Sequence, residues 1–140
     1  MSTVPERRPP ALDGERVQAF VIAAHGDHDA VREGLAAEQA LANACWDWGG
    51  GDFESALGGA AHMGRRDIAL VLLEHGARMD VFAAAMLGEI EIVQAMLAAN
   101  PALVEATGPH GIPLLAHAKA GREDALAVVE LFELELAKAR

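Results

Sequence analysis

One arrangement of small, polar and apolar residues recurs four times along the chain. In each copy alanines precede a glycine, polar residues follow it directly, and apolar residues stand four, five, eight and nine places after it, apart from Gly34 and Glu130. The four glycines are Gly26, Gly64, Gly88 and Gly121. The apolar spacing predicts an amphipathic helix after each glycine, and alanine favours a short helix before it. Self-similarity of this kind indicates a stacked helical repeat.

Each copy is interpreted as a pair of helices. We expect the glycine to adopt the left-handed conformation that ends the first helix and turns the chain back. The apolar face of the second helix cannot be covered by one pair alone, so the copies must stack. We therefore predict an all-α solenoid of four helix pairs, closed by a last helix at about residues 123–137. Asp13 is expected to cap the first helix, whose apolar stripe is Val17, Phe20 and Val21.

The spacing between the four glycines is irregular, at 38, 24 and 33 residues. Between Gly64 and Gly88 the two helix pairs are joined only by GARMD, so the hairpin there is predicted to be truncated. Between the first two copies the chain has five extra residues, which lie in WDWGGGDF at 46–53. The hairpin at that place is predicted to be enlarged.

Two segments resemble ankyrin repeats. EHGARMD at 74–80 is similar to the ankyrin helix end, and GIPLLAHAKAG at 111–121 is similar to the ankyrin TPLHxAAxxG box, although the threonine and histidine of that box are absent. The chain resembles an ankyrin repeat protein over roughly residues 15–137. More narrowly, WDWGGGDFESALGGAAHMGRRDI at 46–68 followed by GPHGIPLLAHAKAG at 108–121 resembles small bacterial ankyrin-like proteins. The resemblance implies a protein-binding scaffold whose surface consists of the hairpin tips and the inner helices.

Composition and charge restrict the partners that can be expected. The chain has 140 residues, 52% of them hydrophobic, which suits one folded domain. The formal net charge of −10 argues against binding to nucleic acid or to an anionic membrane surface, and is compatible with a basic partner. No apolar run reaches the roughly 18 residues of a membrane helix, and the single cysteine fits a reducing compartment, so we expect a cytoplasmic protein.

The chain is divided into a tail and one domain. Residues 1–12 contain three of the six prolines and no periodicity, and they are predicted to be a flexible N-terminal tail. Residues 13–140 are predicted to form a single ankyrin-like repeat domain. Arginine outnumbers lysine, and alanine and glycine are abundant, which suggests a bacterial source.

Catalytic and metal-binding motifs are not recognisable in the sequence. It lacks a phosphate loop, a GxSxG elbow and an HExxH pair. A metal site assembled from His25 and His62 is conceivable, but we expect ordinary surface or cap histidines. Asp47, Asp52 and Glu54 surround three glycines, and we expect a solvated hairpin tip there rather than a calcium site. No catalytic residue, metal or cofactor is therefore predicted.

The leading functional hypothesis is a non-catalytic module that binds an unidentified protein or peptide. Aromatic residues on loops often anchor such interfaces, and the enlarged hairpin contains both tryptophans. The predicted contact residues are Trp46, Trp48, Asp52 and Phe53 at this tip, His110 at another tip, and His25, His62, Met86 and Lys119 along the groove.

Several alternatives stay open. Trp46 and Trp48 can equally cover the core beside the hairpin. A small molecule or metal, or the substrate of a weak enzyme, can be held among His25, His62, Asp52 and Glu54. The protein can also be a self-associating structural subunit, and the sequence does not determine its oligomeric state.

Overall fold

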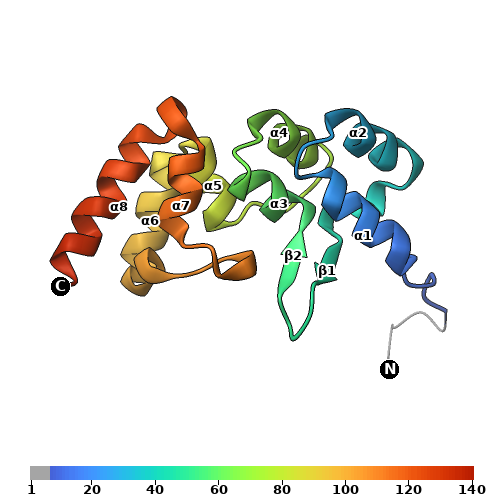
Figure 1. Ribbon diagram of the computed structural model, residues 1–140, viewed down its shortest axis with the longest axis horizontal. Coiled ribbons are helices and arrows are strands. Elements are labelled where there is room, and N and C mark those ends of the chain that lie inside the picture. The colour runs from blue at the N-terminus through green and yellow to red at the C-terminus, as the bar shows by residue number, and fades with distance from the viewer. Residues whose placement is uncertain (1–6) are drawn as a thin grey trace, which may run out of the picture.

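A computed structural model describes residues 7–140 and shows a mostly helical chain (Figure 1). The prediction of an all-α fold is confirmed for this part of the chain, with one short two-stranded hairpin added. The α-helices are α1 (Gly14–Ala23), α2 (His28–Ala37), α3 (Ala56–His62), α4 (Arg66–Glu74), α5 (Val81–Leu87), α6 (Ile90–Ala99), α7 (Leu114–Ala120) and α8 (Leu126–Lys138). The short 3-10 helices are η1 (Gln39–Asn43), η2 (Pro101–Glu105), η3 (Pro109–Gly111) and η4 (Arg122–Ala125), and the strands are β1 (Cys45–Asp47) and β2 (Phe53–Ser55).

Consecutive helices pack in pairs, and the first helices of the pairs pack against one another. Contacts join α1 to α2, α3 to α4, α5 to α6 and α7 to α8. Further contacts join α1 to α3, α3 to α5 and α5 to α7. Figure 1 shows this row from α1 and α2 at one end to α8 at the other. The inner helices come close together because small residues face their neighbours, as Ala83, Ala84 and Ala85 of α5 do at 0% exposure.

The start of the domain follows the sequence prediction. The Asp13 side chain accepts a hydrogen bond from the backbone N–H of Arg16 at 3.2 Å and caps α1. The predicted stripe of Val17, Phe20 and Val21 is buried. Residues 7–12 of the predicted tail have no helix or strand, although Leu12 packs against the core, and residues 1–6 lie outside the described residues.

The left-handed glycine prediction is correct for two of the four copies. Gly64 and Gly88 have φ values of 67° and 76°. It is wrong for Gly26 and Gly121, which do not have positive φ, and Arg122 takes the left-handed conformation instead at φ 54°. Gly121 is required for a different reason, because a Cβ atom there would lie 2.1 Å from the carbonyl oxygen of Met86. At Gly26 the next helix is started by the Asp27 side chain, which caps α2.

The two irregular connections are visible in the structure. The enlarged connection forms an antiparallel hairpin in which Cys45 pairs with Ser55 and Asp47 with Phe53. Figure 1 shows this hairpin projecting from the row of helices. Residues 75–80, between α4 and α5, contain no strand. None of the helices in residues 7–140 is long and apolar enough to cross a membrane.

Candidate metal centre

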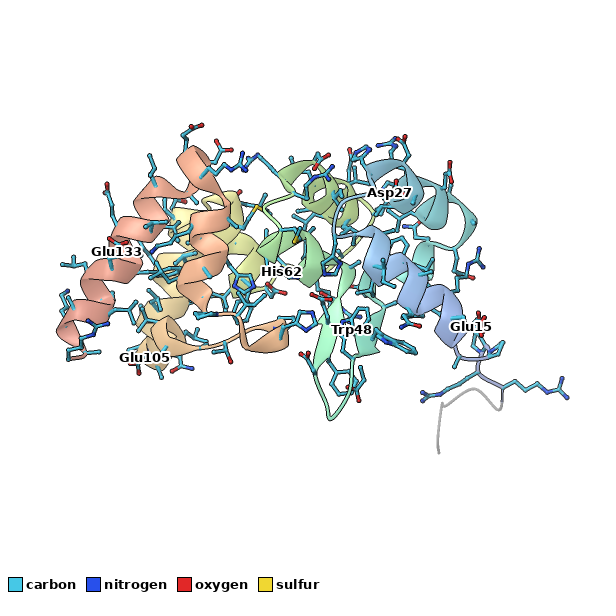
Figure 2. The ribbon with its side chains drawn as sticks, viewed as in Figure 1. Glu15, Asp27, Trp48, His62, Glu105 and Glu133 are labelled. Atoms are coloured by element: carbon cyan, nitrogen blue, oxygen red, sulfur yellow. The ribbon has the colours of Figure 1, made fainter. Side chains whose placement is uncertain are left out.

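Four side chains from different parts of the chain converge beside the hairpin. His25 follows α1, Glu54 is the middle residue of β2, His62 ends α3, and His110 lies in η3. One possible ligand atom from each of the four lies within 4.8 Å of the others. Figure 2 labels His62 here, with Trp48 of the hairpin next to the same cluster.

The contacts within the cluster are short. Glu54 Oε2 lies 3.0 Å from His62 Nε2 and 3.4 Å from His110 Nε2. Glu54 Oε1 lies 3.2 Å from His25 Nε2, and the Nε2 atoms of His25 and His62 are 3.1 Å apart. The Nε2 atoms of three imidazoles therefore surround one carboxylate.

The other ring nitrogens of two histidines fix the direction of their lone pairs. His25 Nδ1 is 2.8 Å from the carbonyl oxygen of Val21, and His110 Nδ1 is 2.7 Å from Asp52 Oδ2. Since both partners are acceptors, each Nδ1 must donate its proton, and a neutral ring then directs the Nε2 lone pair at Glu54. Lone pairs that face a carboxylate at this distance repel it, and a proton or a metal ion between them stabilises the arrangement.

Glu54 is a fully buried acid, with a side chain at 0% exposure. Burial by itself raises the pKa of Glu54, but hydrogen bonds from His25 and His62 more than offset this, and its net pKa is well below the usual range. The hydrogen bond with Glu54 is also the main reason that the pKa of His25 is raised. The cluster thus favours an ionised carboxylate and a positive charge beside it.

Trp48 and Asp52 hold the outer side of the cluster. The indole Nε1–H of Trp48 donates to Glu54 Oε1 at 2.9 Å. The Asp52 carboxylate accepts from the backbone N–H of His110 at 2.8 Å as well as from its ring. The two bonds between Asp52 and His110 link the hairpin to the η3 loop. They orient His110, whose backbone is left-handed at φ 62°.

His117 lies behind the cluster. Its side chain is fully buried, and its ring centroid lies 6.4 Å from that of His62. His117 Nδ1 donates to the carbonyl oxygen of Pro113 at 2.9 Å, and among the described residues Nε2 has no hydrogen-bond partner. Burial lowers the pKa of His117, so this imidazole is neutral at pH 7.

The predicted site residues fall into two groups. The structure brings His25, His62, His110, Asp52 and Trp48 together at the cluster. It leaves four others outside it, namely Trp46, Phe53, Met86 and Lys119.

The residues outside the cluster have different environments. Met86 is 1% exposed, so its prediction as a groove contact is wrong, because it is buried in the core cluster with residues of α3 and α4. Trp46 is half-buried against the core near Gly14. Phe53 is 63% exposed, and Lys119 is also exposed.

Sequence reasoning missed how central Glu54 is. The alternation of side chains along a strand could have predicted the burial of Glu54, because Phe53 and Ser55 face away from the side on which Glu54 is buried. The pairing of Asp52 with His110, 58 positions apart, has no local signal.

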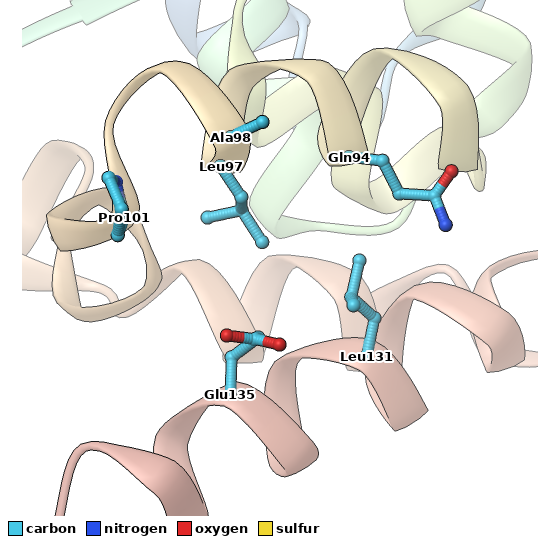
Figure 3. Close-up of a pocket in the computed structure, with 6 residues that line it drawn as sticks. All are labelled: Gln94, Leu97, Ala98, Pro101, Leu131 and Glu135. Atoms are coloured by element: carbon cyan, nitrogen blue, oxygen red, sulfur yellow. The ribbon is translucent and has the colours of Figure 1, made fainter.

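A cavity lies away from the cluster, between α6 and α8 (Figure 3). Its volume is about 220 Å³, and its lining includes no histidine or cysteine among the described residues. The lining residues are Gln94, Leu97, Ala98, Pro101, Leu131 and Glu135. It offers no comparable set of ligand atoms.

Comparison of the chain with protein families, curated proteins and solved structures found no match.

Proposed function

We propose that the protein binds a divalent transition-metal ion, zinc in the first instance, through His25, Glu54, His62 and His110. The observation that carries this proposal is the convergence of three imidazole Nε2 atoms on a fully buried carboxylate. The Nδ1 atoms of His25 and His110 are hydrogen-bonded to oxygen acceptors. A metal-bound histidine usually donates its second ring N–H to an acceptor of this kind.

The donor set and its spacing favour zinc. Zinc accepts nitrogen and carboxylate ligands, whereas calcium and magnesium prefer oxygen alone. Zinc–nitrogen bonds of about 2.0–2.1 Å give a tetrahedron with edges of roughly 3.3 Å. Four contacts of the cluster measure 3.0, 3.1, 3.2 and 3.4 Å, close to such edges, and they involve both oxygens of Glu54. With one ligand atom taken from each residue, the four atoms lie within 4.8 Å of one another, so binding of the ion draws them somewhat closer together.

Calorimetric titration with zinc tests the proposal. The wild-type protein is expected to bind one ion per chain, and His28→Ala is expected to bind it equally, because His28 lies outside the cluster. The absence of binding heat, or binding that His62→Ala leaves unchanged, would contradict the proposal.

Asp52 gives a second test in the same titration. Asp52→Ala removes both hydrogen bonds that orient His110 while keeping the four ligands. Loss of such an outer partner typically weakens metal affinity about 10- to 100-fold. Asp47→Ala is the matched control, because within residues 7–140 the Asp47 side chain accepts hydrogen bonds only from the backbone N–H groups of Gly49 and Gly51 in the hairpin turn. Equal zinc affinities of the two variants would show that Asp52 does not position His110.

Binding of a protein partner is a second candidate function, on an ankyrin-like repeat scaffold. The stacking of helix pairs supports such a scaffold, and the large exposed side chain of Phe53 on the hairpin supports a contact surface. Lys119 is also exposed, so its side chain is accessible to a protein partner. A basic partner and a bacterial cytoplasmic setting stay predictions from the composition.

Phe53→Ser separates this function from metal binding. Because Phe53 is 63% exposed, the substitution is expected to change the free energy of unfolding by no more than about 0.5 kcal/mol and to leave zinc affinity unchanged. Affinity capture from the native host is expected to recover a partner with the wild type and to lose it with Phe53→Ser. Recovery of the same proteins by both would remove Phe53 from the contact surface.

A further inference from the structure

A pocket of about 320 Å³ opens directly over the proposed metal site, and its lining residues are Ile22, His25, Trp48 and His110. Two of these are proposed metal ligands, and the other two contribute apolar surface. The volume lies at the lower end of the range of about 300–1,000 Å³ that is typical of small-molecule sites.

The pocket lies on the outer side of the cluster. The Glu54 side chain is 0% exposed, whereas those of His25 and His110 are 25% and 35% exposed. An ion held by these groups therefore has the carboxylate on its inner side and the pocket on its outer side. An added donor reaches the ion from the outer side, as a fifth ligand beside the four protein donors, since zinc can expand from four-coordinate to five-coordinate.

We infer that this pocket binds a small ligand that has an oxygen donor group for the metal and a flat apolar body against Ile22 and Trp48. The inference rests on the proposed metal site. A divalent ion with Glu54 as its one anionic ligand keeps a positive charge, which favours an anionic donor such as a carboxylate or hydroxamate oxygen. The apolar body is expected because Ile22, 54% exposed, and the face of Trp48 gain by being covered.

Cobalt(II) as the bound metal allows the two proposals to be tested separately. Cobalt(II) in a site with nitrogen and oxygen ligands absorbs visible light, and its spectrum changes when a further ligand binds. Failure of the cobalt bands to appear would overturn the metal site and this inference with it. Cobalt bands that do not change on addition of benzohydroxamate would overturn the ligand site alone.

The apolar part is tested with two probes and two variants. Benzohydroxamate is expected to bind the cobalt protein about tenfold more tightly than acetohydroxamate, because only the former has a ring to bury. Ile22→Ser is expected to weaken benzohydroxamate binding about fivefold and to leave acetohydroxamate binding unchanged. Met63→Ser is the matched control, because Met63 is 52% exposed but does not line the pocket. Equal affinities for the two probes, or equal effects of the two substitutions, would overturn the inference.

Discussion

Zinc at a thousandfold excess over its dissociation constant is expected to raise the free energy of unfolding by about 4 kcal/mol. The ion stabilises the folded state because its ligands come together only there. His25 and His62 are 37 positions apart in the chain, and His110 is held in place by a residue 58 positions away. The unfolded chain has no such preformed site, so the binding free energy adds to the folding free energy.

Thermal unfolding followed by circular dichroism measures this effect. For a domain of about this size the unfolding temperature rises roughly 3 °C per kcal/mol, so a shift of about 12 °C is expected with zinc and its loss with a chelator. Magnesium is the matched control ion and is expected to have no effect. The zinc shift should become smaller as the pH falls from 7.5 to 5.5, because protons compete with the metal for the imidazole nitrogens. Identical unfolding temperatures with and without zinc would contradict the prediction.

Local patterns were sufficient to predict most of the helices. The apolar spacing after each glycine reports a helix face that needs no information about its neighbours, and α2, α4 and α6 follow it. The backbone conformation at the glycines could not be predicted equally well. Gly121 is explained by the approach of a carbonyl oxygen from α5, which is a tertiary contact and leaves no local pattern.

The candidate site could be predicted only in part. The sequence identified His25, His62, Asp52 and Glu54 as a possible ligand set, because both histidines lie just before the glycines of neighbouring copies. The sequence favoured a protein-contact surface over a metal or ligand site, because the spacing of residues along the chain does not show that Glu54 is buried. The contribution of His110 depends on how the η3 loop folds over the hairpin, and the contacts with Asp52 and Glu54 that reveal it join distant parts of the chain.

Glu54→Gln is expected to weaken zinc binding by about two to three and a half orders of magnitude. The substitution keeps the shape of the side chain and an oxygen that can accept from the Trp48 indole, but it removes the negative charge. Removal of one member of a buried charge pair costs about 3–5 kcal/mol, which corresponds to that loss of affinity. The effect is large because Glu54 is fully buried, so water cannot replace the missing charge.

A matched comparison isolates the buried charge from the general acidity of the protein. Glu91→Gln removes the same charge from an exposed position on α6 and is expected to leave zinc affinity unchanged. Competition with a chelator of known affinity measures the dissociation constants of both variants and the wild type. Circular dichroism without metal checks that Glu54→Gln remains folded, so that a loss of affinity reports on the site. A Glu54→Gln protein that binds zinc as tightly as Glu91→Gln would show that the buried carboxylate is part of a metal-independent hydrogen-bond network with His25, His62 and Trp48.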